Sequence, residues 1–146
     1  MRTLEDFSTY PYKNPMEWLL MVVGEVRVMP VVREWEVDFW EVQPGLRGKV
    51  LAVGERSMML YGVLERGASF PEHSHPHEQI GFCLKGRAEF KIGEGIELVE
   101  EGSSYWIPPN APHYVRNVGE GDFVFVEVFT PLREDLLGRR FGYLKR

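Results

Sequence analysis

One stretch of the chain reads His73-Ser74-His75-Pro76-His77-Glu78-Gln79. The fourth and last histidine, His113, follows the proline-rich segment Pro108-Pro109-Asn110-Ala111-Pro112. A neutral imidazole nitrogen is a good ligand for transition metals near pH 7. Because the two clusters together hold every histidine of the chain, they indicate two halves of one metal site. The alternative is four unrelated histidines with ordinary hydrogen bonds.

The spacing of the first cluster predicts ligands on one face of a strand. Side chains two apart in a strand point to the same side, so we expect His73 and His75 to point the same way, and Gln79 has the same parity. His113 would close the site from another strand or loop. Three imidazoles and one amide oxygen leave positions open in an octahedral shell, which is typical of a reactive metal. For His77 two interpretations stay open: a residue that supports the ligands, or a histidine that faces solvent.

From about Glu36 onward, short apolar stretches alternate with glycine turns. Strands are expected at Lys49–Val53, Met58–Leu64, Arg87–Ile92, Ile96–Val99 and Phe123–Thr130. Many short strands at regular spacing favour an all-β antiparallel sandwich or barrel. Asn14-Pro15 is typical of a helix start, so Met16–Val23 is interpreted as a short helix, with a strand as the alternative. The residues from Glu134 are expected to hold one helical turn that ends at Gly138.

Composition limits the classes of partner. The chain has 146 residues, which fits one domain, and a formal net charge of -5 with no basic run, so nucleic acid is not expected. The single cysteine, Cys83, excludes an internal disulfide, is interpreted as a small core residue, and favours a reducing cytoplasm. The apolar run Trp18–Val23 is too short for a membrane span and lacks signal-peptide features. Unpaired edge strands favour a homodimer.

The segment Phe123–Phe129 places a carboxylate in an aromatic row. Its odd positions read Phe, Phe, Glu, Phe, so Glu127 is a candidate acid/base if the row faces the metal, and a polar interruption if it faces solvent. Arg133 could bind a substrate carboxylate, or it could pair with Glu134 or Asp135. Tyr105 is interpreted as a core residue. Gly81 and Cys83 share the parity of Gln79 and are expected to leave volume beside the metal.

The spacing of these residues resembles the two cupin motifs. The first is matched by Gly67, five residues, His73-x-His75, three residues, Gln79, six residues and Gly86. The second is matched by Gly102, five residues, Pro108-x-Asn110, two residues, His113, three residues and Asn117. The family usually has glutamate at the Gln79 position and glycine at the Asn110 position. The resemblance implies a cupin-type jelly-roll β-barrel over residues 35–135, with an N-terminal extension (1–34) and a C-terminal tail (136–146). It also implies a divalent nickel, zinc, manganese or iron ion held by His73, His75, Gln79 and His113.

A narrower resemblance joins the segments 73–81, 107–113 and 128–135 to the KdgF pectin-degradation cupins. Those proteins convert 4,5-unsaturated uronates into linear keto sugars, and they too carry glutamine at the Gln79 position. The resemblance implies functional roles for Glu127, Phe129 and Arg133. The family has aspartate where this chain has Glu127, so the carboxylate here extends one methylene further.

The glutamine also bears on the reaction class. A neutral amide leaves a divalent metal site with its full positive charge, which favours Lewis-acid chemistry over redox cycling. We therefore expect ring opening and tautomerisation of a small unsaturated uronate, with the metal on the substrate carboxylate and a ring oxygen. Arg133 would orient the carboxylate and Glu127 would move a proton. A cupin dioxygenase and a non-catalytic module that binds a small ligand stay open as alternatives.

Overall fold

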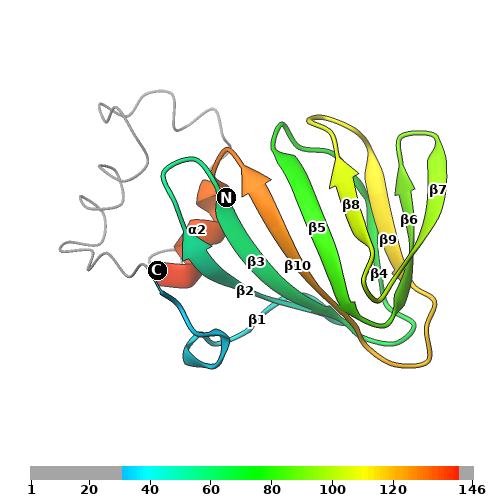
Figure 1. Cartoon of the computed structure of the whole chain (residues 1–146), viewed down its shortest axis with the longest axis horizontal. Coiled ribbons are helices and arrows are strands. Elements are labelled where there is room, and N and C mark those ends of the chain that lie inside the picture. The colour runs from blue at the N-terminus through cyan, green and yellow to red at the C-terminus, as the bar shows by residue number, and fades with distance from the viewer. Residues whose placement is uncertain (1–30, 142–146) are drawn as a thin grey trace.

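The computed structural model describes residues 31–141, which form two antiparallel β-sheets and two short helices (Figure 1). The six-stranded sheet has the order β1-β2-β3-β10-β5-β8, and the four-stranded sheet has the order β4-β9-β6-β7. The strands are β1 (Trp40–Gln43), β2 (Leu46–Val53), β3 (Met58–Leu64), β4 (Ser69–His73), β5 (Glu78–Lys85), β6 (Arg87–Ile92), β7 (Gly95–Glu100), β8 (Ser104–Ile107), β9 (His113–Asn117) and β10 (Phe123–Thr130). The helices are the 3-10 helix η2 (Glu34–Glu36) and α2 (Glu134–Phe141).

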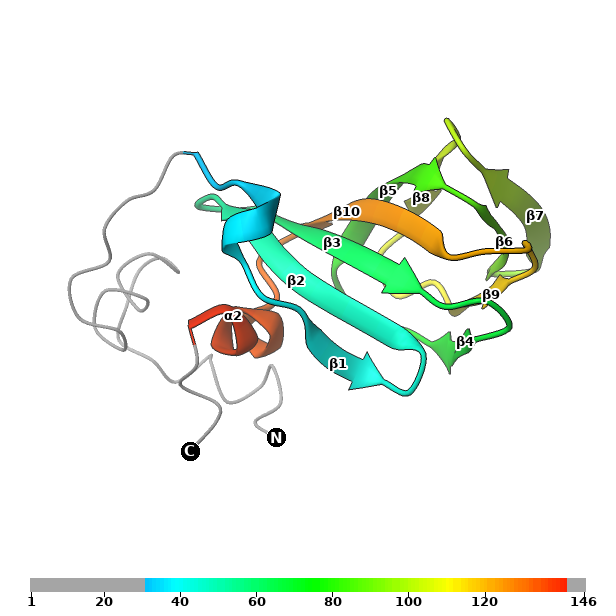
Figure 2. The same cartoon turned by 90° about the horizontal axis from the view of Figure 1, so that it is seen from below.

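The two sheets face each other as the walls of a jelly-roll barrel, and α2 lies at one end beside β2 (Figure 2). The all-β barrel expected from the sequence is confirmed. Three strands, β3, β6 and β10, have the predicted ends, because alternation and glycine turns mark them locally. The second strand is longer than predicted, since β2 begins at Leu46 rather than Lys49.

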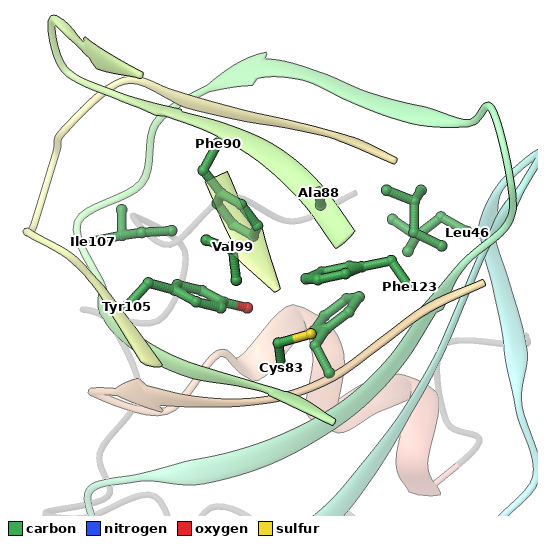
Figure 3. Close-up of a cluster of buried hydrophobic side chains, with 10 residues drawn as sticks. Leu46, Cys83, Ala88, Phe90, Val99, Tyr105, Ile107 and Phe123 are labelled. Carbon is green, nitrogen blue, oxygen red and sulfur yellow. The ribbon is translucent and has the colours of Figure 1, made fainter. Parts of the chain in front are cut away.

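The barrel interior is filled from both sheets. Along β10 the odd positions are buried and the even positions half-buried, as the pattern predicts for a strand with one inward face. Phe123 is stacked on Phe125 with ring centroids 5.3 Å apart. Figure 3 shows Tyr105, Phe90 and Cys83 among the side chains of this core. Cys83 is fully buried, so it is the core residue that the sequence predicts.

The structure corrects the expectation for the C-terminal end. The α2 helix does not end at Gly138 but continues to Phe141. Glycine in a helix interior costs about 1 kcal/mol relative to alanine. Packing offsets this cost, because Leu137 is fully buried against Val50, Met58 and neighbouring apolar side chains. The helix predicted at Met16–Val23 lies outside the described residues. No helix within residues 31–141 has both the length and the hydropathy that a bilayer span requires.

Candidate metal centre and its cavity

Three of the predicted ligands converge where β4 ends and β9 begins. His73 closes β4, His113 opens β9, and the two are register partners with ring centroids 4.2 Å apart. His75 points toward the same site as His73, as predicted, but not through strand parity: β4 ends at His73, and His75 lies in the loop that follows. The ligand nitrogens of the three rings all lie within 4.8 Å of one another, so this triad could hold a metal ion.

Each of the three imidazoles is oriented by a backbone carbonyl that lies within two residues. The Nδ1 bonds run from His73 to Pro71 (2.9 Å), from His75 to His77 (3.0 Å) and from His113 to Ala111 (2.8 Å). A carbonyl oxygen only accepts, so Nδ1 of each ring carries the proton. Each Nε2 therefore presents a lone pair, which is the form in which histidine binds a metal.

The amide of Gln79 turns its oxygen toward this cluster. Its nitrogen donates to the carboxylate of Glu127, and this fixes which end of the amide faces the histidines. The oxygen Oε1 lies 3.1 Å from Nε2 of His75, although both atoms are acceptors and neither holds a proton for the other. Nε2 of His113 is buried without a hydrogen-bond partner. Lone pairs that face one another and a buried acceptor without a donor fit a cation bound between them.

The protonation state of the rings also suits a metal. Burial lowers the pKa of His73, of His113 and of His75, the last to about 4, and the positive charge of Arg133 acts in the same direction. All three rings are therefore neutral near pH 7, as ligation requires. The donor set of imidazoles and one amide oxygen accommodates nickel, zinc, manganese and iron alike.

A cavity of about 140 Å³ opens beside the triad. Its polar lining includes His73, Gln79, His113, Glu127 and Arg133. Its apolar lining consists of Trp40, Val42, Leu46, Leu60, Phe70, Phe90, Ile107, Val115, Phe125, Phe129 and Leu136. The aromatic row of β10 therefore faces the barrel interior, where Phe125, Glu127 and Phe129 line the cavity and Phe123 lies in the core. The alternative that the row faces solvent is wrong.

Glu127 is buried in the wall of this cavity. The hydroxyl of Tyr105 donates to its Oε1 at 2.7 Å, and the amide of Gln79 is a second donor. Burial raises the pKa of Glu127, and these two bonds and the charge of Arg133 offset part of that rise. A carboxyl group in this setting keeps its proton to higher pH than an exposed one.

Arg133 lies at the edge of the cavity and has two contacts there. Its guanidinium pairs with Asp135 at 2.9 Å and lies 5.1 Å from the ring centroid of Phe129. The Phe129 ring in turn lies against His75, with centroids 5.8 Å apart. The ion pair considered from the sequence is thus present, while the guanidinium also lines the cavity. Roles in substrate binding for Arg133 and Phe129 stay predictions.

His77 is 2% exposed, so the interpretation that it faces solvent is wrong. Its carbonyl orients His75, and its own ring bonds to the backbone of Leu132. The second bond ties the ring to the segment that leads into α2. His77 therefore supports a ligand through its backbone.

Three features of the site are not predicted from the sequence. Gly81 does not leave volume, because the ring of Tyr105 occupies the space above it: a Cβ there would lie 2.1 Å from Cζ of that tyrosine. Tyr105 is a core residue as predicted, but the sequence does not indicate its bond to Glu127. Nor does it indicate that Trp40 and Val42 of β1 form cavity wall. The sequence carries no local signal for these contacts, since they depend on the order of strands in the sheet.

Comparison with known proteins agrees with this geometry. Residues 60–129 match the family model described as Cupin domain. The chain carries a cupin domain. The jelly-roll barrel is thus of the cupin type, as the motif spacing implied, and both predicted motifs lie within the matched segment.

Two solved structures illustrate the relationship. This cupin is similar to KdgF from Halomonas sp., with a TM-score of 0.69 and 26% identity over 73% of this chain and 96% of that one. An RmlC-like cupin from Shewanella frigidimarina has a TM-score of 0.68 and 20% identity, covering 73% and 95% of the two chains, and shares the fold.

A curated relative, an H2HPP isomerase from Bacillus subtilis, is 30% identical over 94 residues, or 64% of this chain. The chain spans only 39% of the length of that relative.

Proposed function

We propose that this cupin is a metal-dependent isomerase that opens and tautomerises a small unsaturated uronate to a linear keto sugar. The observation that carries the proposal is the position of Glu127, a buried carboxylate on the same cavity wall as the predicted ligand Gln79. An acid/base group beside a cation site is the arrangement that such a proton transfer needs. The similarity to KdgF supports the substrate class, and the name of the Bacillus subtilis relative supports isomerase chemistry.

The residues of the chain have separate roles in this proposal. A divalent cation held by His73, His75, Gln79 and His113 would supply Lewis-acid polarisation of a substrate oxygen. Glu127, whose pKa is raised by burial, delivers a proton to carbon as the enol becomes a ketone, and the carboxylate that results takes up the proton lost from the enol oxygen. Arg133 orients the substrate carboxylate through its planar guanidinium. Phe129 keeps that guanidinium in place through the ring contact and excludes water from the ligand side.

The test is an absorbance assay on the unsaturated uronates that a polysaccharide lyase releases. Metal-loaded protein is expected to remove the alkene absorbance under nitrogen, faster than buffer does. Glu127→Gln should lose about 100-fold or more of the rate, the contribution of general acid/base catalysis. Glu89→Gln is the matched control, because Glu89 also accepts a tyrosine hydroxyl at 2.7 Å but lies on the outer face. Decay at the buffer rate would exclude this substrate.

The apolar walls favour a second candidate, an isomerase acting on a carboxylate with an apolar body. A sugar ring needs hydrogen-bond partners, whereas most of the cavity lining is apolar. The two substrate classes are distinguished by measuring kcat/KM for an unsaturated uronate and for a cyclic unsaturated keto acid. The remaining alternatives differ in other readouts: a dioxygenase consumes oxygen, and a binding module retains the ligand unchanged.

A further inference from the structure

A tyrosine reaches Glu127 from two strands away. In the six-stranded sheet Glu127 of β10 lies opposite Gly81 of β5, and Gly81 lies opposite Tyr105 of β8. Neighbouring strands are about 4.8 Å apart, so the backbones of Tyr105 and Glu127 are separated by roughly 10 Å. The length of the phenol side chain spans this gap, because the strand between them contributes no side chain.

Gly81 is what allows the contact. A Cβ at this position would lie 2.1 Å from Cζ and 2.4 Å from the hydroxyl oxygen of Tyr105. A side chain at position 81 would therefore displace the phenol from its position across β5. On its other side the ring packs against Phe90, with centroids 4.5 Å apart. The phenol is thus held between a glycine and an aromatic ring, and its hydroxyl ends at Oε1 of Glu127.

The hydrogen bond from Tyr105 restricts the conformational freedom of the Glu127 side chain. Glutamate has one more rotatable bond than the aspartate of the resembling family, so its carboxylate can occupy more positions. A reacting group must be held in place, because misplacement by about 1 Å can lower a rate about 100-fold. The donors found for the Glu127 carboxylate, Tyr105 and Gln79, come from strands on the same sheet, so they fix it against the rigid part of the barrel.

We propose that Tyr105 is a positioning residue, whose hydroxyl reaches over Gly81, holds Oε1 of Glu127 and so fixes the orientation of this carboxylate beside the cavity. This inference rests on the role of Glu127 in the proposed function. It adds a residue outside the ligand set and identifies Gly81 as the position that makes the contact possible.

Tyr105→Phe tests the proposal, because it removes one hydroxyl and leaves the ring packing in place. We expect kcat to fall about 10- to 100-fold, while KM and the metal content of the purified protein stay within about twofold. Tyr114→Phe is the matched control: Tyr114 donates to Glu89 at the same 2.7 Å on the outer face, and its loss should leave kcat unchanged. Gly81→Ala retains the hydroxyl but displaces the phenol, so it should lower kcat in the same way, and it tests the contact if Tyr105→Phe does not fold.

Two further measurements separate positioning from a general structural effect. In a Glu127→Asp background the shorter carboxylate no longer reaches the hydroxyl, so adding Tyr105→Phe should change kcat less than twofold. Crystal structures of the wild type and of Tyr105→Phe give a readout independent of turnover: the Glu127 carboxylate should leave its position. An unmoved carboxylate, or an unchanged kcat, overturns the proposal. If the wild type turns over no candidate substrate, the proposed function fails, and the crystallographic comparison alone decides the positioning role.

Discussion

Replacing Glu127 by glutamine should change stability in a way that depends on pH. The side chain is buried, and burial raises its pKa above the value of an unfolded chain. Below about pH 4.5 the carboxyl is protonated in both states and contributes no difference. As the pH rises, the unfolded chain ionises first while the folded protein keeps its proton, so the free energy of unfolding falls. Above the pKa of the folded protein, the free energy of unfolding is lowered by the full cost of burying the ionised carboxylate. Glutamine has no such proton, and the variant is spared this decline.

The size of the effect follows from the same linkage. Each unit by which the folded pKa exceeds the unfolded one costs the wild type about 1.4 kcal/mol at high pH. Glutamine at position 127 also changes the hydrogen bonds at this site. That change adds the same free energy at every pH, so it does not affect how the difference between wild type and variant varies with pH. The quantity to follow is therefore the wild-type minus variant difference, and its decline should begin near the unfolded pKa and end at the folded one.

The assay is urea unfolding of both proteins from about pH 3 to about pH 8, with a chelator present so that no cation contributes. Glu89→Gln serves as the control of opposite sign. The hydrogen bond from Tyr114 lowers the pKa of Glu89, so that carboxylate stabilises the fold above the unfolded pKa, and the contribution is lost as the pH falls. A Glu127 difference that is flat, or that rises with pH, would refute the conclusion that this carboxyl is destabilised by burial.

Three further predictions concern the metal and the C-terminal helix. At a free metal concentration 100 times Kd, bound metal should stabilise the wild type by about 2.7 kcal/mol and so raise its Tm. The His113→Ala variant should show neither the rise in Tm on addition of metal nor bound metal in elemental analysis. The pKa of His75 is about 4, so protein desalted at successively lower pH should keep its metal through pH 6.5 and release it as the pH approaches 4; loss already at pH 6.5 would contradict this. Leu137→Ala should lower the free energy of unfolding by about 2–5 kcal/mol, because this side chain is fully buried. Leu98→Ala is the control: its side chain is 47% exposed, so the change should be less than about 0.5 kcal/mol. Equal losses would show that α2 does not pack as described.

The residues of β10 show how far sequence reasoning reaches. Its ends follow from alternation with period two, which is a local property, and the same alternation puts Glu127 on one face with the phenylalanines of the strand. The barrel then decides that this face points inward. The convergence of His73 and His113 follows from motif spacing. The strand ends and the face of Glu127 need only the chain near each residue and the assumption of a barrel, whereas the convergence of the two distant histidines is implied by the resemblance to the cupin motifs.

The contacts that sequence reasoning misses are those that depend on partners distant in sequence. The sequence around Gly81 does not indicate that β8 is the neighbouring strand. Parity therefore predicts empty space above Gly81, where the structure has the ring of Tyr105. Parity also extends the strand through His75, because it cannot locate the residue at which a strand ends. The predicted α2 is too short because the intrinsic cost of Gly138 is local, while the compensating burial of Leu137 comes from β2 and β3.

The carbonyl bonds to the three ligand histidines have a consequence for how the protein acquires its ion. Each ring takes its orientation from its own short turn, through Pro71, His77 or Ala111, and none of these bonds needs a cation to form. We expect the metal ion to bind to a preformed site, with little change in protein conformation when the ion binds or dissociates. One ion could then be exchanged for another in the native state, and the element recovered with the purified protein would reflect the metals supplied to the cells as much as the preference of the site.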